Sequence, residues 1–174
     1  ESMSSALPRI RSRDALLYLY TSGTTGVPKG VVLSHANVIA RGRNYWRQFM
    51  ITGDDKCYNL APLFRGAAMF SVVITGICYG ITIVIPPDFR PHHVWEEIIS
   101  ENVSFLHANP FHFAVLANMP GNENGRFPNI RLCFSSGNRL SPAISDKFFD
   151  KFGTKIAERY GTVEAGGICV DGRT

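Results

Sequence analysis

The feature that most constrains the fold of this chain is a regular alternation of short apolar runs with segments of helical character. We expect strands near residues 14–20, 31–33, 57–60, 81–85, 103–106, 130–134 and 155–159. We expect helices at residues 34–49, 66–79, 91–101, from 110 onward, and 142–152. Because strands that alternate with helices build parallel βαβ units, the sequence predicts an α/β fold with a mainly parallel sheet and helices on both faces.

Helix-start residues support several of these boundaries. Ser34 suits the N-cap of the first helix. Pro91 lies in the first turn of another, and Ser141 with Pro142 supplies a cap and a first helical residue to the last. The first two apolar runs are instead joined by a long Gly-rich connection, which predicts a hairpin with an unusual loop.

The composition fits one globular domain. The chain has 174 residues, 45% of them hydrophobic, and its 18 Lys and Arg against 14 Asp and Glu give a net charge of +4. This composition excludes collagens, coiled coils and disordered tails. Two basic clusters occur, one of Arg9, Arg11 and Arg13 and one of Arg41, Arg43 and Arg47. Basic clusters can contact phosphates, but the small charge excess favours solvated faces, so we expect no nucleic-acid partner.

Residues 66–85 carry no charged side chain and reach the length of about 20 residues that a membrane-spanning helix needs. The alternative is a buried helix that stops at Gly80, followed by a buried β-branched strand. A mean hydropathy near zero favours this alternative, so we expect no transmembrane segment. The four cysteines lack C-x-x-C spacing and the N-terminus lacks a signal-peptide pattern, which together favour reduced thiols in a cytoplasmic protein.

The segment 21–30 (TSGTTGVPKG) is the strongest candidate for a binding site. It combines hydroxyls, glycines and one cation: Thr21, Ser22, Gly23, Thr24, Thr25, Gly26, Lys29 and Gly30. Backbone N–H groups, hydroxyls and a positive charge suit a polyphosphate. The segment is not a Walker A loop, because Pro28 replaces the second glycine and Gly30 follows Lys29. The alternative is an ordinary exposed hairpin loop, for which this segment would be long.

The run YTSGTTGVPKGVVLSH, at residues 20–35, resembles the signature loop of the adenylate-forming enzymes, a family that includes the acyl-CoA synthetases. Residues 61–67 (APLFRGA), 135–142 (SSGNRLSP) and 159–164 (RYGTVE) resemble further segments of that family. The resemblance implies that a carboxylate attacks the α-phosphate of ATP, giving an acyl-adenylate and pyrophosphate. A thiol, often that of coenzyme A, would then take the acyl group.

The resemblance also implies roles for single residues. The loop 21–29 would hold the β- and γ-phosphates with Lys29 as counter-charge, and Glu164 would ligate Mg²⁺, which prefers oxygen ligands. The adenosine site would be formed by Gly137, Asn138, Arg139, Tyr160 and Gly161, with the Tyr160 ring stacked on the adenine. The acyl pocket would be lined by Phe64, Arg65 and Gly66, and His112 is either a further lining residue or a packed core residue.

Two positions depart from the family pattern. The Thr that precedes the family's Glu is Val163 here, and Thr162 lies one place earlier. Either Thr162 contacts the α-phosphate through a shifted loop, or the site is weakened. The His of the family's P-L-F-H segment is Arg65, which could contact a phosphate or an acidic substrate, or face solvent.

The family's hinge, its C-terminal lobe with a catalytic Lys and the upstream part of its large lobe have no counterpart in the 174 residues. We therefore expect residues 14–174 to be the ATP-binding subdomain of a larger ligase, inactive alone, after a flexible segment at residues 1–13. The expected substrate is a fatty, aryl or other simple carboxylic acid, since residues 63–65 (LFR) lack the Asp of peptide-synthetase adenylation domains. The alternative is a degenerate nucleotide-binding module without turnover.

Overall fold

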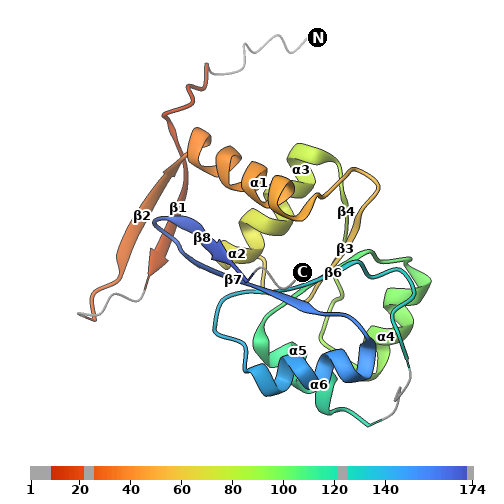
Figure 1. Ribbon diagram of the computed structural model, residues 1–174. Coiled ribbons are helices and arrows are strands. Elements are labelled where there is room, and N and C mark those ends of the chain that lie inside the picture. The colour runs from red at the N-terminus through yellow and green to blue at the C-terminus, as the bar shows by residue number, and fades with distance from the viewer. Residues whose placement is uncertain (1–8, 22–25, 121–124, 172–174) are drawn as a thin grey trace.

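The computed structural model describes residues 9–21, 26–120 and 125–171, and its centre is a six-stranded sheet (Figure 1). The strands lie in the order β4 (Thr82–Val84), β3 (Lys56–Asn59), β5 (Phe105–Ala108), β6 (Leu132–Ser135), β7 (Ile156–Thr162) and β8 (Gly166–Val170). All neighbouring pairs from β4 to β7 are parallel, and β8 pairs antiparallel with β7. The expected α/β fold with a mainly parallel sheet is confirmed.

Helices cover both faces of this sheet (Figure 1). One face packs against α1 (His35–Phe49) and against a continuous helical segment formed by α2 (Gly66–Ala68), the π-helix η1 (Met69–Ile74) and α3 (Thr75–Tyr79). The other face packs against α4 (Pro91–Ser100), α5 (Pro110–Asn118) and α6 (Pro142–Phe152).

Alternation along the strands divides the buried side chains between two cores. Phe105 of β5 and Phe134 of β6 point toward α1, where Tyr45 and Phe49 meet the Phe134 ring edge-on. Their neighbours Leu106 and Cys133 point to the opposite core, with the aromatic rings of α5 and α6. Successive strand side chains face opposite sides of a sheet, so each of these two short, fully buried strands contributes to both cores.

A separate hairpin of β1 (Ala15–Thr21) and β2 (Lys29–Ser34) precedes α1 and projects from the main body (Figure 1). Its large side chains Tyr18, Tyr20 and Val32 are more than half exposed. The step into α1 is fixed by a capping box, in which the Ser34 hydroxyl accepts from the Asn37 N–H and the Asn37 side chain accepts from the Ser34 N–H. The predicted hairpin and the predicted N-cap are both confirmed.

Several boundaries differ from the sequence expectations. The final strand, expected at residues 155–159, continues to Thr162 and turns back into β8, so the two strands form a β-hairpin that the sequence did not predict. Ser141 occupies the N-cap of α6, but its hydroxyl makes no capping bond. Residues 66–85 form the helix–Gly80–strand arrangement, and no helix in the described part of the chain has the length and apolarity to span a membrane. Residues 1–8 of the expected N-terminal segment lie outside the described residues, whereas the Ser12 carbonyl accepts from the Ala36 N–H.

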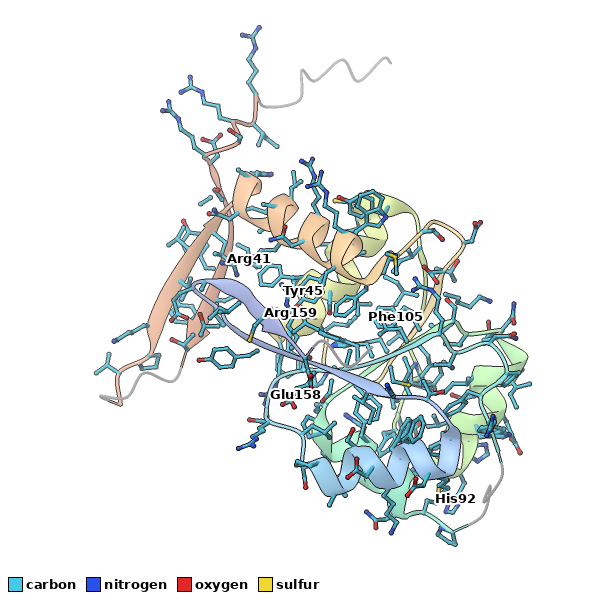
Figure 2. The ribbon with its side chains drawn as sticks, in the orientation of Figure 1. Arg41, Tyr45, His92, Phe105, Glu158 and Arg159 are labelled. Atoms are coloured by element: carbon cyan, nitrogen blue, oxygen red, sulfur yellow. The ribbon has the colours of Figure 1, made fainter. Side chains whose placement is uncertain are left out.

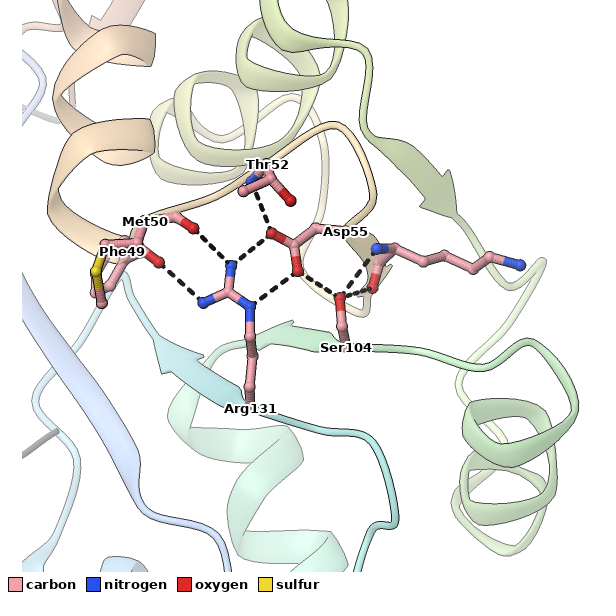
Figure 3. A network of polar contacts seen from close by, with 7 residues as sticks. Phe49, Met50, Thr52, Asp55, Ser104 and Arg131 are labelled. Atoms are coloured by element: carbon pink, nitrogen blue, oxygen red, sulfur yellow. Dashed lines mark hydrogen bonds and ion pairs between the residues drawn. The ribbon is translucent and has the colours of Figure 1, made fainter.

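The edge of the sheet where the strands begin is fastened by one polar network (Figure 3). Arg131, just before β6, donates to the Asp55 carboxylate and to the Phe49 and Met50 carbonyls at the end of α1. Asp55 also accepts from the Thr52 N–H and from the Ser104 hydroxyl. The Ser104 hydroxyl oxygen in turn accepts from the Lys56 N–H at the start of β3. This network joins α1, β3, β5 and β6 at the end of the sheet opposite the candidate site.

Candidate functional site

A cavity of about 210 Å³ opens where the parallel strands end. Its walls come from α1, from residues 65–67 after β3, from Ser136 and Gly137 after β6, and from the β7–β8 hairpin. Ligands of open α/β sheets bind in crevices outside the carboxyl ends of the strands. The cavity therefore brings together three segments that the sequence singled out separately, 61–67, 135–142 and 159–164.

The β7–β8 turn is held in place by Arg41 of α1. The Arg41 Nη1 donates to the Val163 carbonyl at 2.7 Å, and its Nη2 donates to the Glu164 carbonyl at 2.8 Å. The Arg41 side chain also lies over the Phe70 ring of η1. The sequence prediction that this arginine belongs to a solvated face is wrong, because Arg41 is buried on the same helix face as Val38 and Tyr45.

Glycines allow the close approach of the two hairpin strands. A Cβ at Gly161 would lie 2.3 Å from the Gly166 carbonyl oxygen, so no larger residue fits there without a shift of the backbone. Gly166 itself has a positive φ of 77°, a conformation that side chains oppose. The turn at residues 163–165 thus has a fixed shape, and it places Val163 and Thr162 on the cavity wall.

Thr162 is engaged within this turn. Its hydroxyl oxygen accepts from the Ala165 N–H at 3.0 Å, which leaves the hydroxyl hydrogen free to donate to a ligand. Val163 has no such group, and Glu164 follows with an exposed side chain that makes no hydrogen bond or ion pair within the described residues. Of this trio, Thr162 is the residue that can donate a hydrogen bond and Glu164 is the one that can ligate a cation.

A buried polar ladder supports the floor of the cavity. The His107 ring of β5 contacts Asn59 Oδ1 through Nδ1 at 2.7 Å and the Ser136 hydroxyl through Nε2 at 2.9 Å. Asn59 in turn donates to the Ala61 carbonyl. Burial lowers the pKa of His107 to about 3, with a smaller contribution from His112. A neutral His107 therefore links the loop after β3 to the loop after β6.

The loop after β6 is also tied to β7. The Leu140 N–H donates to the Glu158 carboxylate at 2.8 Å, which fixes the turn that begins at Gly137, where φ is 95°. Within this turn Gly137 lines the cavity, whereas Asn138 and Arg139 are exposed beside it. The geometry leaves the backbone of this turn open to a ligand.

The candidate phosphate loop is described only at its ends. Ser22, Gly23, Thr24 and Thr25 lie outside the described residues. Thr21, the last residue of β1, pairs with Lys29, the first residue of β2, and Gly26 between them has a positive φ of 80°. Lys29 is exposed at the first position of β2.

The remaining candidates are divided between the cavity and other places. Arg65 and Gly66 line the cavity, whereas Phe64 does not, and 74% of the Phe64 surface is exposed. Tyr160 is 62% exposed on the hairpin, next to Gly161 on the cavity wall. His112 is buried at the start of α5, edge-on to the Phe89 ring, and does not line the cavity.

Sequence reasoning missed Tyr45 and Arg159 as cavity residues (Figure 2). Arg159 is buried, and its guanidinium carbon lies 3.5 Å from the centre of the Tyr45 ring. Burial lowers the pKa of Arg159. A signal was present in the sequence, since Tyr45 follows Arg41 by about one helical turn and Arg159 directly precedes Tyr160 and Gly161.

Comparisons with known proteins agree with these motifs. Residues 2–174 match the family model described as AMP-binding enzyme. The chain is 31% identical over 155 residues to the oxalate–CoA ligase of Saccharomyces cerevisiae, covering 89% of this chain and 28% of the ligase. It is 30% identical over 162 residues to the sulfoacetate–CoA ligase of Cupriavidus necator, covering 92% of this chain and 31% of the ligase.

Solved structures show the same fold. ATP-bound MatB from Rhodopseudomonas palustris superimposes with a TM-score of 0.82 at 24% identity, covering 92% of this chain and 32% of MatB. The N-terminal domain of FACL13 from Mycobacterium tuberculosis gives a TM-score of 0.77 at 27% identity, covering 87% of this chain and 38% of that domain. The chain spans about three tenths of the length of the two curated ligases above. Its family match, motifs and cavity establish that the chain belongs to the AMP-binding, or adenylate-forming, enzymes.

Proposed function

We propose that this chain is the nucleotide- and acyl-binding part of a longer ligase that activates a carboxylic acid with ATP. The acid's carboxylate oxygen would attack the α-phosphorus, and the bond from that phosphorus to pyrophosphate would break. A thiol, for which coenzyme A is the best candidate, would then attack the acyl carbon and release AMP. The carrying observation is that three family segments, distant in sequence, line one cavity at the carboxyl ends of the parallel strands.

The residues around the cavity suit this chemistry by positioning and by charge. We assign the triphosphate to the loop 21–29 and Lys29, and the adenosine to Tyr160 and the turn that begins at Gly137. Transfers of this kind depend mainly on the alignment of the reactants and on donors and cations aimed at the developing charge. Thr162, through its free hydroxyl hydrogen, is the candidate donor to the α-phosphate.

Glu164 is the candidate ligand for Mg²⁺. Its side chain is exposed at the turn and is left without a hydrogen-bond partner in the described chain, so it is available to a cation. A site with one carboxylate fits Mg²⁺, which keeps several waters and takes its other oxygens from the phosphates of a substrate. When bound, the ion would neutralise phosphate charge, and the Arg41 contacts to the Val163 and Glu164 carbonyls would hold its ligand in position.

The size of the chain and its exposed hairpin support a place within a longer protein. The ligases to which it is similar are about three times as long, and the outward side chains Tyr18, Tyr20 and Val32 of the β1–β2 hairpin are apolar and exposed. We propose that the reacting acid and thiol meet between this part and a further lobe. The names of the relatives, oxalate–CoA and sulfoacetate–CoA ligase, support coenzyme A as the acceptor.

The experiment is carboxylate-dependent exchange of pyrophosphate into ATP by the longest protein that carries this chain. The proposal predicts exchange that requires both an acid and Mg²⁺, and that is lost in a Lys29→Ala and Glu164→Gln double variant. Exchange without any acid, or none with a broad panel of acids, would contradict it.

Val163 favours a second candidate, a nucleotide-binding module without turnover. A hydrogen bond to a charged group contributes about 1.5–3 kcal/mol, and Val163 cannot make the one that the family's Thr would make. The two candidates differ in the exchange assay. The module would bind ATP but catalyse no pyrophosphate exchange with any acid, and its Val163→Thr variant would gain that exchange.

A further inference from the structure

The cavity is lined by positive charge without matching negative charge. Arg41, Arg65 and Arg159 contribute to its walls, and none of its lining residues carries a carboxylate. Two of these arginines, Arg41 and Arg159, are buried. Arginine stays charged in proteins, and a buried charge without a partner is costly. The cavity is therefore built to receive an anion.

Arg159 is the arginine with unused binding capacity. Its guanidinium lies against the Tyr45 ring at 3.5 Å, and a Cβ on Gly167 would come within 1.6 Å of its Nη2, so the group is confined between an aromatic face and a glycine. Its Nη1 is buried without a hydrogen-bond partner among the described residues, and no described carboxylate forms an ion pair with it.

The other two arginines have different positions. The terminal nitrogens of Arg41 are already engaged by the carbonyls of Val163 and Glu164. Arg65 is exposed at the rim of the cavity. The positive charges left for an anion that enters the cavity are therefore the Arg159 guanidinium on its wall and Arg65 at its rim, while Arg41 keeps the turn closed.

We propose that the acyl substrate is an acid with a second anionic group, a carboxylate or a sulfonate, which Arg159 binds with help from Arg65. This inference rests on the proposed function, because it names the class of acid that the ligase activates. A guanidinium presents paired N–H donors that match the oxygens of such a group.

The test compares matched acids in the longest protein that carries this chain. Malonate, succinate and glutarate are paired with propionate, butyrate and pentanoate, which have the same carbon number but one charge, and sulfoacetate is added as the sulfonate. We expect the doubly charged acids to be favoured in kcat/KM for pyrophosphate exchange by at least about tenfold, the factor that corresponds to 1.4 kcal/mol. Equal use of both series would overturn the inference and leave the proposed function standing.

Variants then identify the residue and the ligand. Arg159→Met is expected to reduce the preference for doubly charged acids to about threefold or less, while the KM for ATP stays unchanged. Arg159→Lys keeps the charge but loses the paired donors, so its preference is expected to lie between those of the wild type and Arg159→Met. A raised KM for ATP with an intact acid preference would show that Arg159 binds a phosphate instead. Arg65→Met, at an exposed position, tests the rim without risk to folding and should weaken the preference less.

Direct binding separates this inference from the proposed function. Calorimetric titration with succinate and with butyrate needs no turnover, so it applies even if exchange is absent. Binding of succinate alone, lost in Arg159→Met, would support the anion site although the ligase activity had failed. Binding of neither acid, or of both equally, would refute the site.

Discussion

Replacement of Arg131 by methionine should lower the free energy of unfolding by about 3 kcal/mol. The guanidinium donates to both oxygens of Asp55 and to the Phe49 and Met50 carbonyls (Figure 3). Removal of one partner from a buried ion pair costs about 3–5 kcal/mol. The Asp55 side chain is only 6% exposed, but that of Arg131 is 38% exposed, so water can reach the vacated side and the lower end of this range applies.

Urea unfolding followed by circular dichroism would measure the change. The matched control is Lys56→Met, which removes the ion pair between Lys56 and Glu101 at the start of β3. That pair is exposed, and such pairs contribute about 0–1 kcal/mol. If Arg131→Met costs no more than Lys56→Met, the network at the N-terminal edge of the sheet does not have the role assigned to it.

The same network predicts a dependence on pH. Burial raises the pKa of Asp55, but hydrogen bonds from Arg131, the Thr52 N–H and Ser104 outweigh it and hold the pKa below its ordinary 3.8. The folded protein then binds the proton less readily than the unfolded chain, so the carboxylate contributes stability above about pH 3.8 that is lost as the pH falls through the folded pKa. The stability difference between the wild type and Asp55→Asn should shrink over this acid range, and a constant difference would contradict the assignment.

Four further predictions concern the site and its support. Lys29→Ala should raise the KM for ATP about tenfold or more, since a charge-assisted contact contributes about 1.5–3 kcal/mol; an unchanged KM would remove Lys29 from the phosphate site. Glu164→Gln should raise the Mg²⁺ concentration that half-saturates activity, and an unaltered magnesium titration would exclude it as a ligand. Val163→Thr should increase adenylation about tenfold or more, whereas no gain would mean that the neighbouring Thr162 hydroxyl already makes this contact. Because the pKa of His107 falls from 6.5 to about 3 on burial, stability should decline as the pH drops between these values; His107→Gln should flatten this decline and the exposed control His92→Gln should not.

Local signals predicted the helices well. The bounds of α1 and α6 agree with the sequence expectations because each has a side-chain or proline start and an apolar face at helical spacing. The observed bounds of short strands such as β5 differ from the expected ones by two residues at each end, since a fully buried strand has no apolar–polar alternation to mark its limits. The strand β8 was missed because two glycines begin it and its pairing with β7 depends on the close approach at Gly161.

The site was predictable as a set of motifs but not as a cavity. The segments at 61–67, 135–142 and 159–164 could be recognised from their residues, and the sheet topology then brought them together. Arg41 was wrongly assigned to a solvated face because its two hydrogen-bond acceptors lie more than 120 residues away in the chain. Arg159 was overlooked for a similar reason, since its partners Tyr45 and Gly167 come from different elements.

The most direct test of the proposed activity is the path of an oxygen atom. A carboxylic acid labelled with ¹⁸O in both carboxylate oxygens would be supplied with ATP, Mg²⁺ and coenzyme A to the longest protein that carries this chain, and the nucleotide product would be analysed by mass spectrometry. Attack of the carboxylate on the α-phosphorus, followed by thiol attack on the acyl carbon, predicts AMP that carries one ¹⁸O and a thioester that retains the other. Unlabelled AMP, or ADP with the label in inorganic phosphate, would contradict the account.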